Sequence, residues 1–512
     1  MTDEKTKEMY LRKILNAKIY DVAVETPIEK ASALSQKLGN TFLLKREDLQ
    51  HVHSFKIRGA YNKMKNLSKE ELSRGVLAAS AGNHAQGVAM SALRLGTKAT
   101  IVMPVTTPEI KISSVRALGA NIVLFGDSYS DCVEEAMRLV KEKGFTYIPP
   151  YDDPDVIAGQ GTVAMEIIRQ HSGKIDAVFV PVGGGGFAAG VAVFIKTVCP
   201  DIKVIGVEPA DSDCMARSIE AGKRIEMERV GLFADGVAVK KPGKITFELC
   251  KKYLDGIVRV RTREICSAIK DIFDSTRSVC EPAGALGLAG AKKYAAENKS
   301  KNETYVSIVS GANMNFDRIR FVSEETEIGE KREAILVCKI PEKKGSFKTF
   351  LSKIGKRNIT EFNYRYADSK SAYVFVGVSV KSVDEIAKLV KLLTSSGIDT
   401  FDLTDDSFAK YHIRHMVGGH SVGIDNEVVY TFEFPERPGA LMDFLNAFSG
   451  RWNITLFHYR NHGANHGRVL VGFDVPEKET KDFSKAIKEF GYKATDVSDN
   501  PAYRFFLCDR NS

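Results

Sequence analysis

Short apolar runs alternate along the chain with longer stretches in which apolar residues recur every three or four positions. This pattern extends from about Thr41 to Gly311. The short runs predict buried strands and the longer stretches predict amphipathic helices. Such alternation is typical of parallel sheets with helices on both faces, which bind ligands at the carboxyl ends of strands. We expect strands near Val76, Ile101, Val123, Val180, Val204 and Val306, and helices that include Ser130–Lys141 and Gly161–Gln170.

The pattern changes after Phe316. Residues 323–333 are mostly charged and lack aromatic side chains, which favours a linker. An internal repeat follows: KIPEKKGSF from Lys339 matches EFPERPGAL from Glu433, and NITEFNYR from Asn358 matches NITLFHYR from Asn453. The tail is therefore predicted to be two copies of one module, residues 334–410 and 428–508. Each copy reads strand, turn, helix, strand, strand, helix, strand.

One uncharged stretch, Ala177–Ile195, is as long as a membrane span. It contains Pro181 and four consecutive glycines, Gly183–Gly186. These residues would cost a lipid-exposed helix several kcal/mol. A buried strand, a glycine turn and a buried helix explain the stretch better.

Composition narrows the class of protein. The 512 residues are 44% hydrophobic and 27% charged, which excludes wholesale disorder and a coiled-coil rod. The net charge of +8 suits anionic small molecules, and no basic, aromatic-bearing motif favours nucleic acid. The eight cysteines form no CxxC pair, and the charged N-terminus does not resemble a signal peptide. Reduced thiols and a cytoplasmic location are therefore expected.

The segment SFKIRGA, residues 54–60, carries the first candidate chemistry. Lys56 lies between Phe55 and Ile57. Apolar surroundings disfavour the ammonium form, so such a lysine becomes a nucleophile that can form a Schiff base. A solvated surface lysine is the alternative for this motif taken alone.

Two further motifs each join a strand to a helix. SAGNHAQG, residues 80–87, offers free backbone N–H groups and the Asn83 amide at a helix start, which suits a carboxylate or a phosphate. PVGGGGFAAG, residues 181–190, lets backbone N–H groups converge on a phosphate. It matches neither dinucleotide nor NTP motifs, so a monophosphate fits better. SIVSGANMN from Ser307 and CEPAGALG from Cys280 complete the set, and either could be structural.

Together these motifs resemble the fold-type II pyridoxal-phosphate enzymes, and within them the biosynthetic threonine deaminases (threonine ammonia-lyases). The resemblance covers nearly the whole chain. It implies an α/β fold with a two-lobed catalytic domain over residues 1–322, whose small lobe spans about 47–145, followed by two ACT-like α+β regulatory modules. It also implies dehydration and deamination of L-threonine to 2-oxobutanoate and ammonia, the first committed step of isoleucine biosynthesis. The cofactor would be pyridoxal 5'-phosphate, and the assembly a homotetramer.

The resemblance also implies roles for individual residues. Lys56 would form the Schiff base with the cofactor and move the α-proton. Phe55 would pack beside the cofactor ring, Asn83 would hydrogen-bond the ring hydroxyl, and Ser310 would meet the pyridine nitrogen. The phosphate would bind to Gly183, Gly184, Gly185, Gly186 and Phe187, and the substrate carboxylate to the backbone of Ser80, Ala81, Gly82, Asn83 and His84.

Ala81 separates this chain from close relatives that racemise serine, because those relatives carry a serine at this position. Without that hydroxyl, elimination is expected to prevail over racemisation. Some serine-acting relatives also place a cation near the residues that match Glu208 and Asp213. The spacing here is not a clean match, so that site stays open. The tail histidines, including His412, His415 and His466, lack carboxylate or cysteine partners at a set spacing, so no metal is predicted.

For the tail, the resemblance implies inhibition by isoleucine and relief by valine. The glycines of the two PExxG turns would let backbone amides approach an effector carboxylate. The candidate regulatory residues are Gly345, Asn363 and Tyr364 in the first module and Gly439, His458 and Tyr459 in the second. Two alternatives stay open, a serine-preferring dehydratase and a non-catalytic amino-acid sensor. Intact Lys56, Asn83 and Ser310 argue against the sensor.

Overall fold

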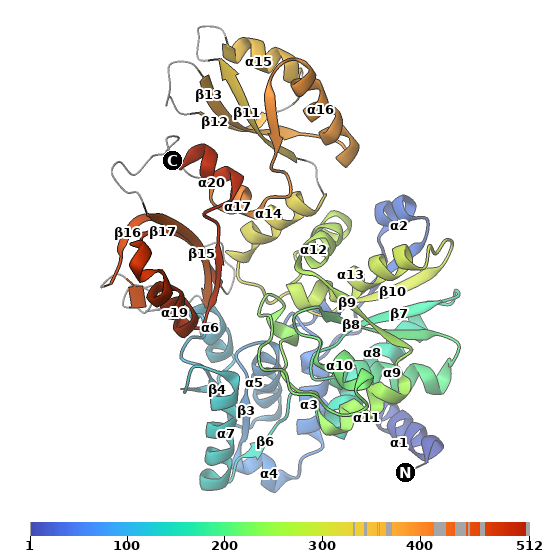
Figure 1. Cartoon of the computed structure of the whole chain (residues 1–512). Helices are drawn as coiled ribbons and strands as arrows, with labels where there is room; N and C mark the ends of the chain where they lie inside the picture. Colours follow the sequence, from blue (N-terminus) through green and yellow to red (C-terminus); the bar gives the residue numbers. More distant parts are fainter. Residues whose placement is uncertain are drawn as a thin grey trace. The chain divides into compact units, whose positions relative to one another are not determined.

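The computed structural model describes residues 2–330, 333–341, 346–355, 357, 359–364, 371–413, 426–435, 447–448, 451–460 and 466–507. The chain divides into two compact units, Met1–Phe316 and Asp317–Ser512 (Figure 1). Each unit is described by itself. The segment predicted as a linker is mostly helical, because α14 spans Arg318–Glu330. The predicted domain boundaries otherwise stay predictions.

The first unit contains two sheets whose strands agree with the predicted alternation. The large sheet has the order β1-β2-β10-β7-β8-β9 and is parallel except for β1, and the small sheet β5-β4-β3-β6 is entirely parallel. The strands are β1 Ile28–Lys30, β2 Thr41–Arg46, β3 Val76–Ala79, β4 Ala99–Met103, β5 Asn121–Leu124, β6 Thr146–Tyr147, β7 Ala177–Pro181, β8 Lys203–Pro209, β9 Gly256–Val260 and β10 Thr304–Val309.

Helices cover both faces of the large sheet. Along β7, Val178 and Val180 pack into a core shared with α1, α8, α9 and α11, whereas the Phe179 ring meets Tyr294 of α13 on the opposite face. This alternation follows from the two-residue period of a strand. The helices of the unit are α1 Asp3–Leu15, α2 Ser32–Leu38, α3 Lys56–Lys65, α4 Lys69–Arg74, α5 Asn83–Leu95, α6 Glu109–Ala117, α7 Tyr129–Lys143, α8 Pro154–Gln170, α9 Gly186–Val198, α10 Cys214–Glu220, α11 Lys244–Tyr253, α12 Thr262–Thr276 and α13 Pro282–Glu297.

The small sheet is the centre of a separate lobe (Figure 1). Val76 and Ala78 face a core that includes residues of α3, α5 and α6, and Leu77 and Ala79 face α7. The stretch Ala177–Ile195 forms β7, a glycine turn and α9, as predicted, although α9 continues to Val198. None of the helices in the described ranges is both long and apolar enough to cross a bilayer.

The second unit contains two antiparallel sheets of equivalent order, β12-β13-β11-β14 and β16-β17-β15-β18. The predicted order of strands and helices is confirmed for the first module, whose turn at residues 342–345 lies outside the described residues. In the second, most of the segment after the first strand lies outside the described residues. The elements are β11 Glu333–Pro341, α15 Ser346–Ile354, β12 Ile359–Tyr364, β13 Ser371–Ser379, α16 Val383–Ser395, β14 Asp399–Asp402, α17 Ser407–Tyr411, β15 Glu427–Pro435, β16 Asn453–Arg460, β17 His466–Asp474, α19 Thr480–Phe490, β18 Lys493–Asp496 and α20 Pro501–Phe506.

The two modules share a core. One face of the first sheet packs on α15 and α16, and the other face contributes Ile335, Val337 and Phe375 to a cluster that also holds Val429 and Leu470 of the second module. The last helix, α20, completes this cluster. Its Phe505 ring lies 4.9 Å from Tyr373, and its Phe506 ring lies 5.9 Å from Phe375. The C-terminal helix of the second module thus covers the sheet of the first.

Candidate active site

Strand ends of both sheets of the first unit bring the predicted catalytic motifs together. The SFK segment and the end of β10 form a short antiparallel bridge, Ser54 with Gly311. The amide of Phe55 donates to the Ser310 carbonyl at 3.1 Å, and the amide of Ala312 donates to the His53 carbonyl at 2.9 Å. Segments more than 250 residues apart in sequence therefore hold each other at one point. The parallel topology predicts this convergence.

Lys56 is the first residue of α3. Its Nζ donates to the Pro150 carbonyl at 3.0 Å. Burial lowers its pKa from 10.5 to about 8, and the negative charge of Glu281 opposes part of this shift. The ammonium form still predominates near neutral pH, but the neutral, nucleophilic form that a Schiff base needs is far more populated than in an exposed lysine.

The glycine loop leaves no room for side chains. A Cβ on Gly184 would lie 2.4 Å from the Tyr151 ring, and one on Gly183 would lie 2.9 Å from Cα of Val237. Gly185 is the N-cap residue of α9 and has φ +95°, a backbone conformation that favours glycine. Only glycines fit here, and the loop ends at a helix N-terminus whose backbone N–H groups suit an anion.

Asn83 is held in one orientation by two partners. Its Oδ1 accepts a hydrogen bond from Asn313 Nδ2 at 2.6 Å, and its Nδ2 donates to Glu281 Oε1 at 2.6 Å. One Nδ2 proton remains for a ligand. The sequence predicted Asn83 but gave no role to Glu281 or Asn313, although both lie within motifs that it singled out.

The remaining predicted residues lie around this centre. The Phe55 and Phe187 rings stack with their centroids 3.9 Å apart and an interplanar angle of 10°. Ser310 is buried, and its hydroxyl makes a long, 3.3 Å bond to the Ala283 carbonyl. Ser80 accepts from the Gly82 amide at 3.2 Å in the turn before α5.

The side chain of His84, in the first turn of α5, points inward from the segment predicted to bind the substrate carboxylate. Its ring nitrogen Nε2 lies 2.8 Å from the Ile148 carbonyl. Burial and the neighbouring Lys56 lower its pKa to about 3, so the imidazole stays neutral. The side chain therefore fixes the loop rather than supplying a charge, and any contribution of His84 to carboxylate binding must come from its backbone.

A phosphorylated aldehyde cofactor fits these residues. The glycine cradle would lose its space if any glycine gained a Cβ, and it offers N–H groups to an anion. Ser54, two residues before Lys56, has a buried hydroxyl without a hydrogen-bond partner in the described part of the chain. A buried polar atom of this kind suggests an additional group in the site. Lys56 supplies the amine to which an aldehyde binds.

A buried ionic cluster lies at the start of α3. Arg58 donates to both oxygens of Glu47, at 2.7 Å each, and to both oxygens of Glu166, at 2.5 and 2.9 Å. Lys45 Nζ also donates to Glu166 at 2.6 Å, and the Tyr20 hydroxyl donates to it at 2.8 Å. The Lys45, Arg58, Glu47 and Glu166 side chains are all 0% exposed. The sequence did not predict this cluster, because charged residues usually indicate surface.

The sequence left open whether a cation binds near Glu208 and Asp213, and in the structure both carboxylates accept hydrogen bonds from the protein. Glu208 is buried and accepts from the amides of Met215 and Ala216, and burial raises its pKa to about 8. The two Asp213 oxygens accept from Arg217 and Arg259, at 2.6 and 2.8 Å. Within the described residues, no group of three or more His, Cys, Asp or Glu side chains is arranged to hold a metal ion.

Four of the six predicted regulatory residues lie in described strands of the second unit. Gly345 and Gly439 lie outside the described residues. The backbones of Asn363 and Tyr364 lie in β12, opposite Phe375 and Val374 of β13. Those of His458 and Tyr459 occupy the equivalent register in β16, opposite Leu470 and Val469. The two sets are therefore matched in backbone register, as the repeat predicts.

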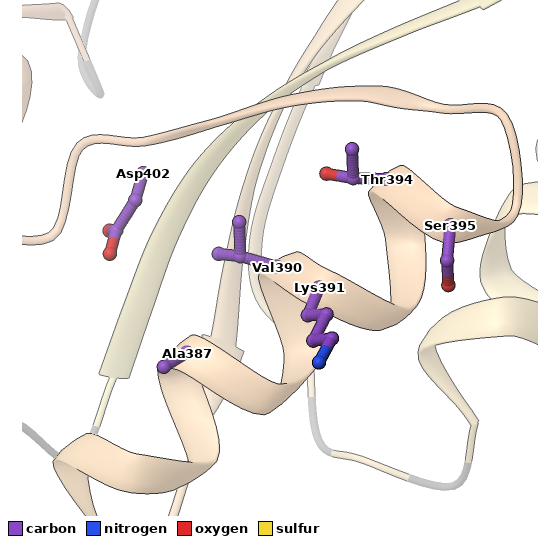
Figure 2. Close-up of a pocket in the computed structure, with 6 residues that line it drawn as sticks. All are labelled: Ala387, Val390, Lys391, Thr394, Ser395 and Asp402. Carbon is purple, nitrogen blue, oxygen red and sulfur yellow. The ribbon is translucent and has the colours of Figure 1, made fainter.

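A groove of about 590 Å³ lies on the first module, outside these predicted sites. Figure 2 shows Asp402 of β14 across from residues along α16. The residues that line the groove are Ala387, Val390, Lys391, Thr394, Ser395 and Asp402.

Comparisons with known proteins agree with both units. The pyridoxal-phosphate dependent enzyme family matches residues 19–311. The C-terminal regulatory domain of threonine dehydratase matches twice, at 324–413 and 418–507. The chain is 56% identical over 501 residues to L-threonine dehydratase biosynthetic IlvA of Burkholderia multivorans, covering 97% of this chain and 99% of the relative.

Two other matches support the same family. The Escherichia coli protein of the same description is 51% identical over 499 residues, with 97% of both chains covered. Among solved structures, the processed form of threonine deaminase isoform 2 from Solanum lycopersicum aligns with a TM-score of 0.63 at 50% identity. The alignment covers 64% of this chain and 90% of that one.

Proposed function

The chain belongs to the biosynthetic threonine dehydratases, which are pyridoxal-phosphate-dependent lyases with two C-terminal regulatory domains, and we propose that it converts L-threonine to 2-oxobutanoate and ammonia. The reaction removes the β-hydroxyl as water, and hydrolysis of the resulting enamine's imine form then releases ammonia. The product would enter isoleucine biosynthesis, as the biosynthetic relatives' role implies.

The observation that carries the proposal is Lys56. Its amine has a pKa of about 8 through burial, and it lies on a segment joined by backbone hydrogen bonds to Ser310 and Ala312. A surface lysine would have neither property. A non-catalytic sensor would have no need of a neutral amine at this position.

Each predicted site residue has a proposed role at a defined atom. Lys56 Nζ would hold the cofactor aldehyde, and as a free amine it would remove the substrate α-proton. The amide N–H groups from Gly183 to Phe187 would hold the phosphate, and those from Ser80 to His84 would bind the substrate carboxylate. Phe55 would pack beside the ring. When bound, pyridoxal phosphate supplies electron withdrawal from the substrate α-carbon.

Asn83 and Ser310 tune this withdrawal. The remaining Nδ2 proton of Asn83 would donate to the ring hydroxyl oxygen and stabilise its negative charge. The Ser310 hydroxyl would meet the pyridine nitrogen, and a hydroxyl does not force such a nitrogen to protonate as a carboxylate would. The weaker electron withdrawal would favour prompt loss of the β-hydroxyl. Ala81 leaves the opposite face without a hydroxyl for reprotonation, so elimination prevails over racemisation.

The direct test is an assay of the purified protein. It should be yellow, and it should release 2-oxo acid from threonine. The ratio of kcat/KM for threonine to that for serine distinguishes the main alternative, because the two substrates differ by one methyl group, worth about 1–3 kcal/mol. A protein that stays colourless and inert after addition of pyridoxal phosphate would instead support the amino-acid sensor.

For the regulatory unit, we propose that isoleucine inhibits the enzyme and that valine relieves the inhibition. The two matched strand pairs give each module a candidate effector site, with Gly345, Asn363 and Tyr364 in one and Gly439, His458 and Tyr459 in the other. Isoleucine and valine differ by one methylene, which binding contacts discriminate only weakly. Opposite responses therefore require that the two effectors favour different conformations of the unit or bind at different sites.

Deleting every residue after Gly329 is expected to leave an active enzyme that isoleucine no longer inhibits. The reason is that both effector sites lie beyond the cut. The measurement is the isoleucine dose-response of threonine turnover in the truncated and full-length chains. Full-length protein offers an independent readout, since its sole tryptophan, Trp452, is buried in the second module and should change fluorescence as isoleucine binds. Inhibition that survives the truncation would refute the assignment.

The proposal also covers the oligomeric state and the cellular location. We propose a homotetramer that acts in the cytoplasm with reduced thiols. None of the seven cysteines in the described residues forms a disulfide bond, and six of them are buried. Sedimentation analysis would test the tetramer.

A further inference from the structure

An ion pair connects the small lobe to the large lobe next to the active site. Nζ of Lys111, in α6, lies 2.7 Å from Oδ2 of Asp235. The two side chains are 19% and 27% exposed, so water reaches the pair only partly. Asp235 begins a single 3₁₀ turn, Asp235–Val237, that follows the large-lobe helix α10 in sequence. Nothing in the sequence motifs singled out either residue.

This turn is one wall of the candidate active site. Cα of Val237 lies 2.9 Å from the position of a Cβ on Gly183, in the phosphate loop. A Cβ on Gly236 would lie 3.5 Å from Glu281 Oε1 and 3.8 Å from Asn83 Nδ2. The turn therefore lies next to the glycine loop and near the Asn83 amide, close enough that one added Cβ would contact each of them. A small displacement of the turn would alter the site at both places.

Lys111 belongs to the lobe that carries residues 80–84, the segment proposed to bind the substrate carboxylate. Ile112 and Val115 of α6 share one core with Ala85 and Val88 of α5, the helix that begins at Asn83. Close packing makes α5 and α6 a rigid body. The Lys111–Asp235 contact therefore joins the body that carries residues 80–84 to the Asp235–Val237 turn of the large lobe.

We propose that Lys111 and Asp235 are positioning residues that hold the Asp235–Val237 turn against the glycine loop when the two lobes are together. The pair thereby couples the position of the carboxylate loop to the wall of the site. This inference rests on the proposed function, because it names residues that serve the same reaction. Partial burial suits this task, since limited access of water makes the pair stronger than a fully exposed one.

The test compares Lys111→Met and Asp235→Asn with the charge-exchanged variant Lys111→Asp/Asp235→Lys, all as full-length holoenzyme. Each single variant should lower kcat/KM for threonine roughly tenfold, since small misplacements at a reacting centre have large effects. The exchanged variant should recover most of that loss. Lys292→Met is the matched control, because Lys292 forms a similarly buried pair with Asp271, 21% and 13% exposed, wholly within the large lobe.

Hydrogen exchange gives a readout that does not depend on turnover. The amides of residues 234–239 should exchange several-fold faster in the single variants and at the wild-type rate in the control and the exchanged variant. Unchanged exchange and unchanged kcat/KM in the single variants would overturn the proposal, as would an exchanged variant no better than either single one. If wild-type protein fails to act on threonine, the proposed function fails, whereas the exchange pattern still decides whether the pair holds the turn.

Discussion

Replacing Lys56 with alanine is expected to lower threonine turnover by more than roughly 10⁴-fold, because the change removes both the cofactor's covalent partner and the base for the α-proton. The protein should fold normally, since Nζ makes one hydrogen bond, to the Pro150 carbonyl. The measurements are single-turnover assays of 2-oxo acid release and the absorbance of the chromophore. Turnover within tenfold of wild type would disprove the role of this lysine and with it the mechanism.

The control for this prediction is Lys65→Ala on the same helix. Lys65 is exposed and pairs with Asp21 at 3.2 Å, remote from the motifs of the site, so turnover should not change. A companion measurement follows the rate at which cofactor-free protein captures pyridoxal phosphate. Only the neutral amine reacts, so the rate should rise with pH and level off above about 8, the lowered pKa of Lys56. An exposed lysine would continue to gain reactivity toward 10.5.

Glu166→Ala is expected to destabilise the catalytic unit by about 3–5 kcal/mol, because it leaves Lys45 and part of Arg58 buried without their counter-charge. Such a loss is a large share of a typical unfolding free energy of about 5–15 kcal/mol. The measurement is the urea midpoint for loss of the chromophore, which reports on the catalytic unit alone. The control is Glu142→Ala, which removes an equally short but exposed pair with Arg138 and should leave the midpoint unchanged.

The pH dependence of this variant adds a second criterion. Burial by itself would raise the pKa of Glu166, but Arg58 and Lys45 outweigh it and lower the pKa below its ordinary value. The carboxylate therefore contributes stability above its ordinary pKa of 4.5, and that contribution falls as pH drops below it. The difference in stability between wild type and Glu166→Ala should shrink in acid. A variant as stable as wild type at neutral pH would show that the cluster does not stabilise the fold.

The sequence predicted the strands whose apolar pattern is unbroken. It did not single out β2, because Lys45 and Arg46 occupy buried positions there. Their pairing with Glu166 and Glu29 depends on residues distant in sequence, which a local pattern cannot reveal. The helix predicted at Gly161–Gln170 begins earlier, at Pro154, since Asp153 caps it and Pro154 occupies its first turn.

In the candidate site too, residues within local sequence motifs were predicted, and residues that act through contacts with distant segments were not. Lys56 was predicted because apolar residues flank it, Asn83 because it follows a strand and opens a helix, and Ser310 through the family resemblance. Tyr151, which fills the space beside Gly184, lies in no motif, and neither does the Lys111–Asp235 pair. Their importance depends on contacts between loops of different lobes. Glu281 and Asn313 could have been found, because both lie in the motifs already selected for their glycines.

The arrangement of the last helix determines how this regulator can be transplanted. Phe505 and Phe506 of α20 pack on Tyr373 and Phe375 of the other copy, and Asn500, which caps α20, donates to Asp406, which caps the equivalent helix α17. A gene encoding one copy alone would yield a sheet with a bare apolar face, prone to aggregate. Protein engineers who wish to graft this sensor onto another enzyme should therefore move both halves of the ancestral duplication together, with the C-terminal helix intact.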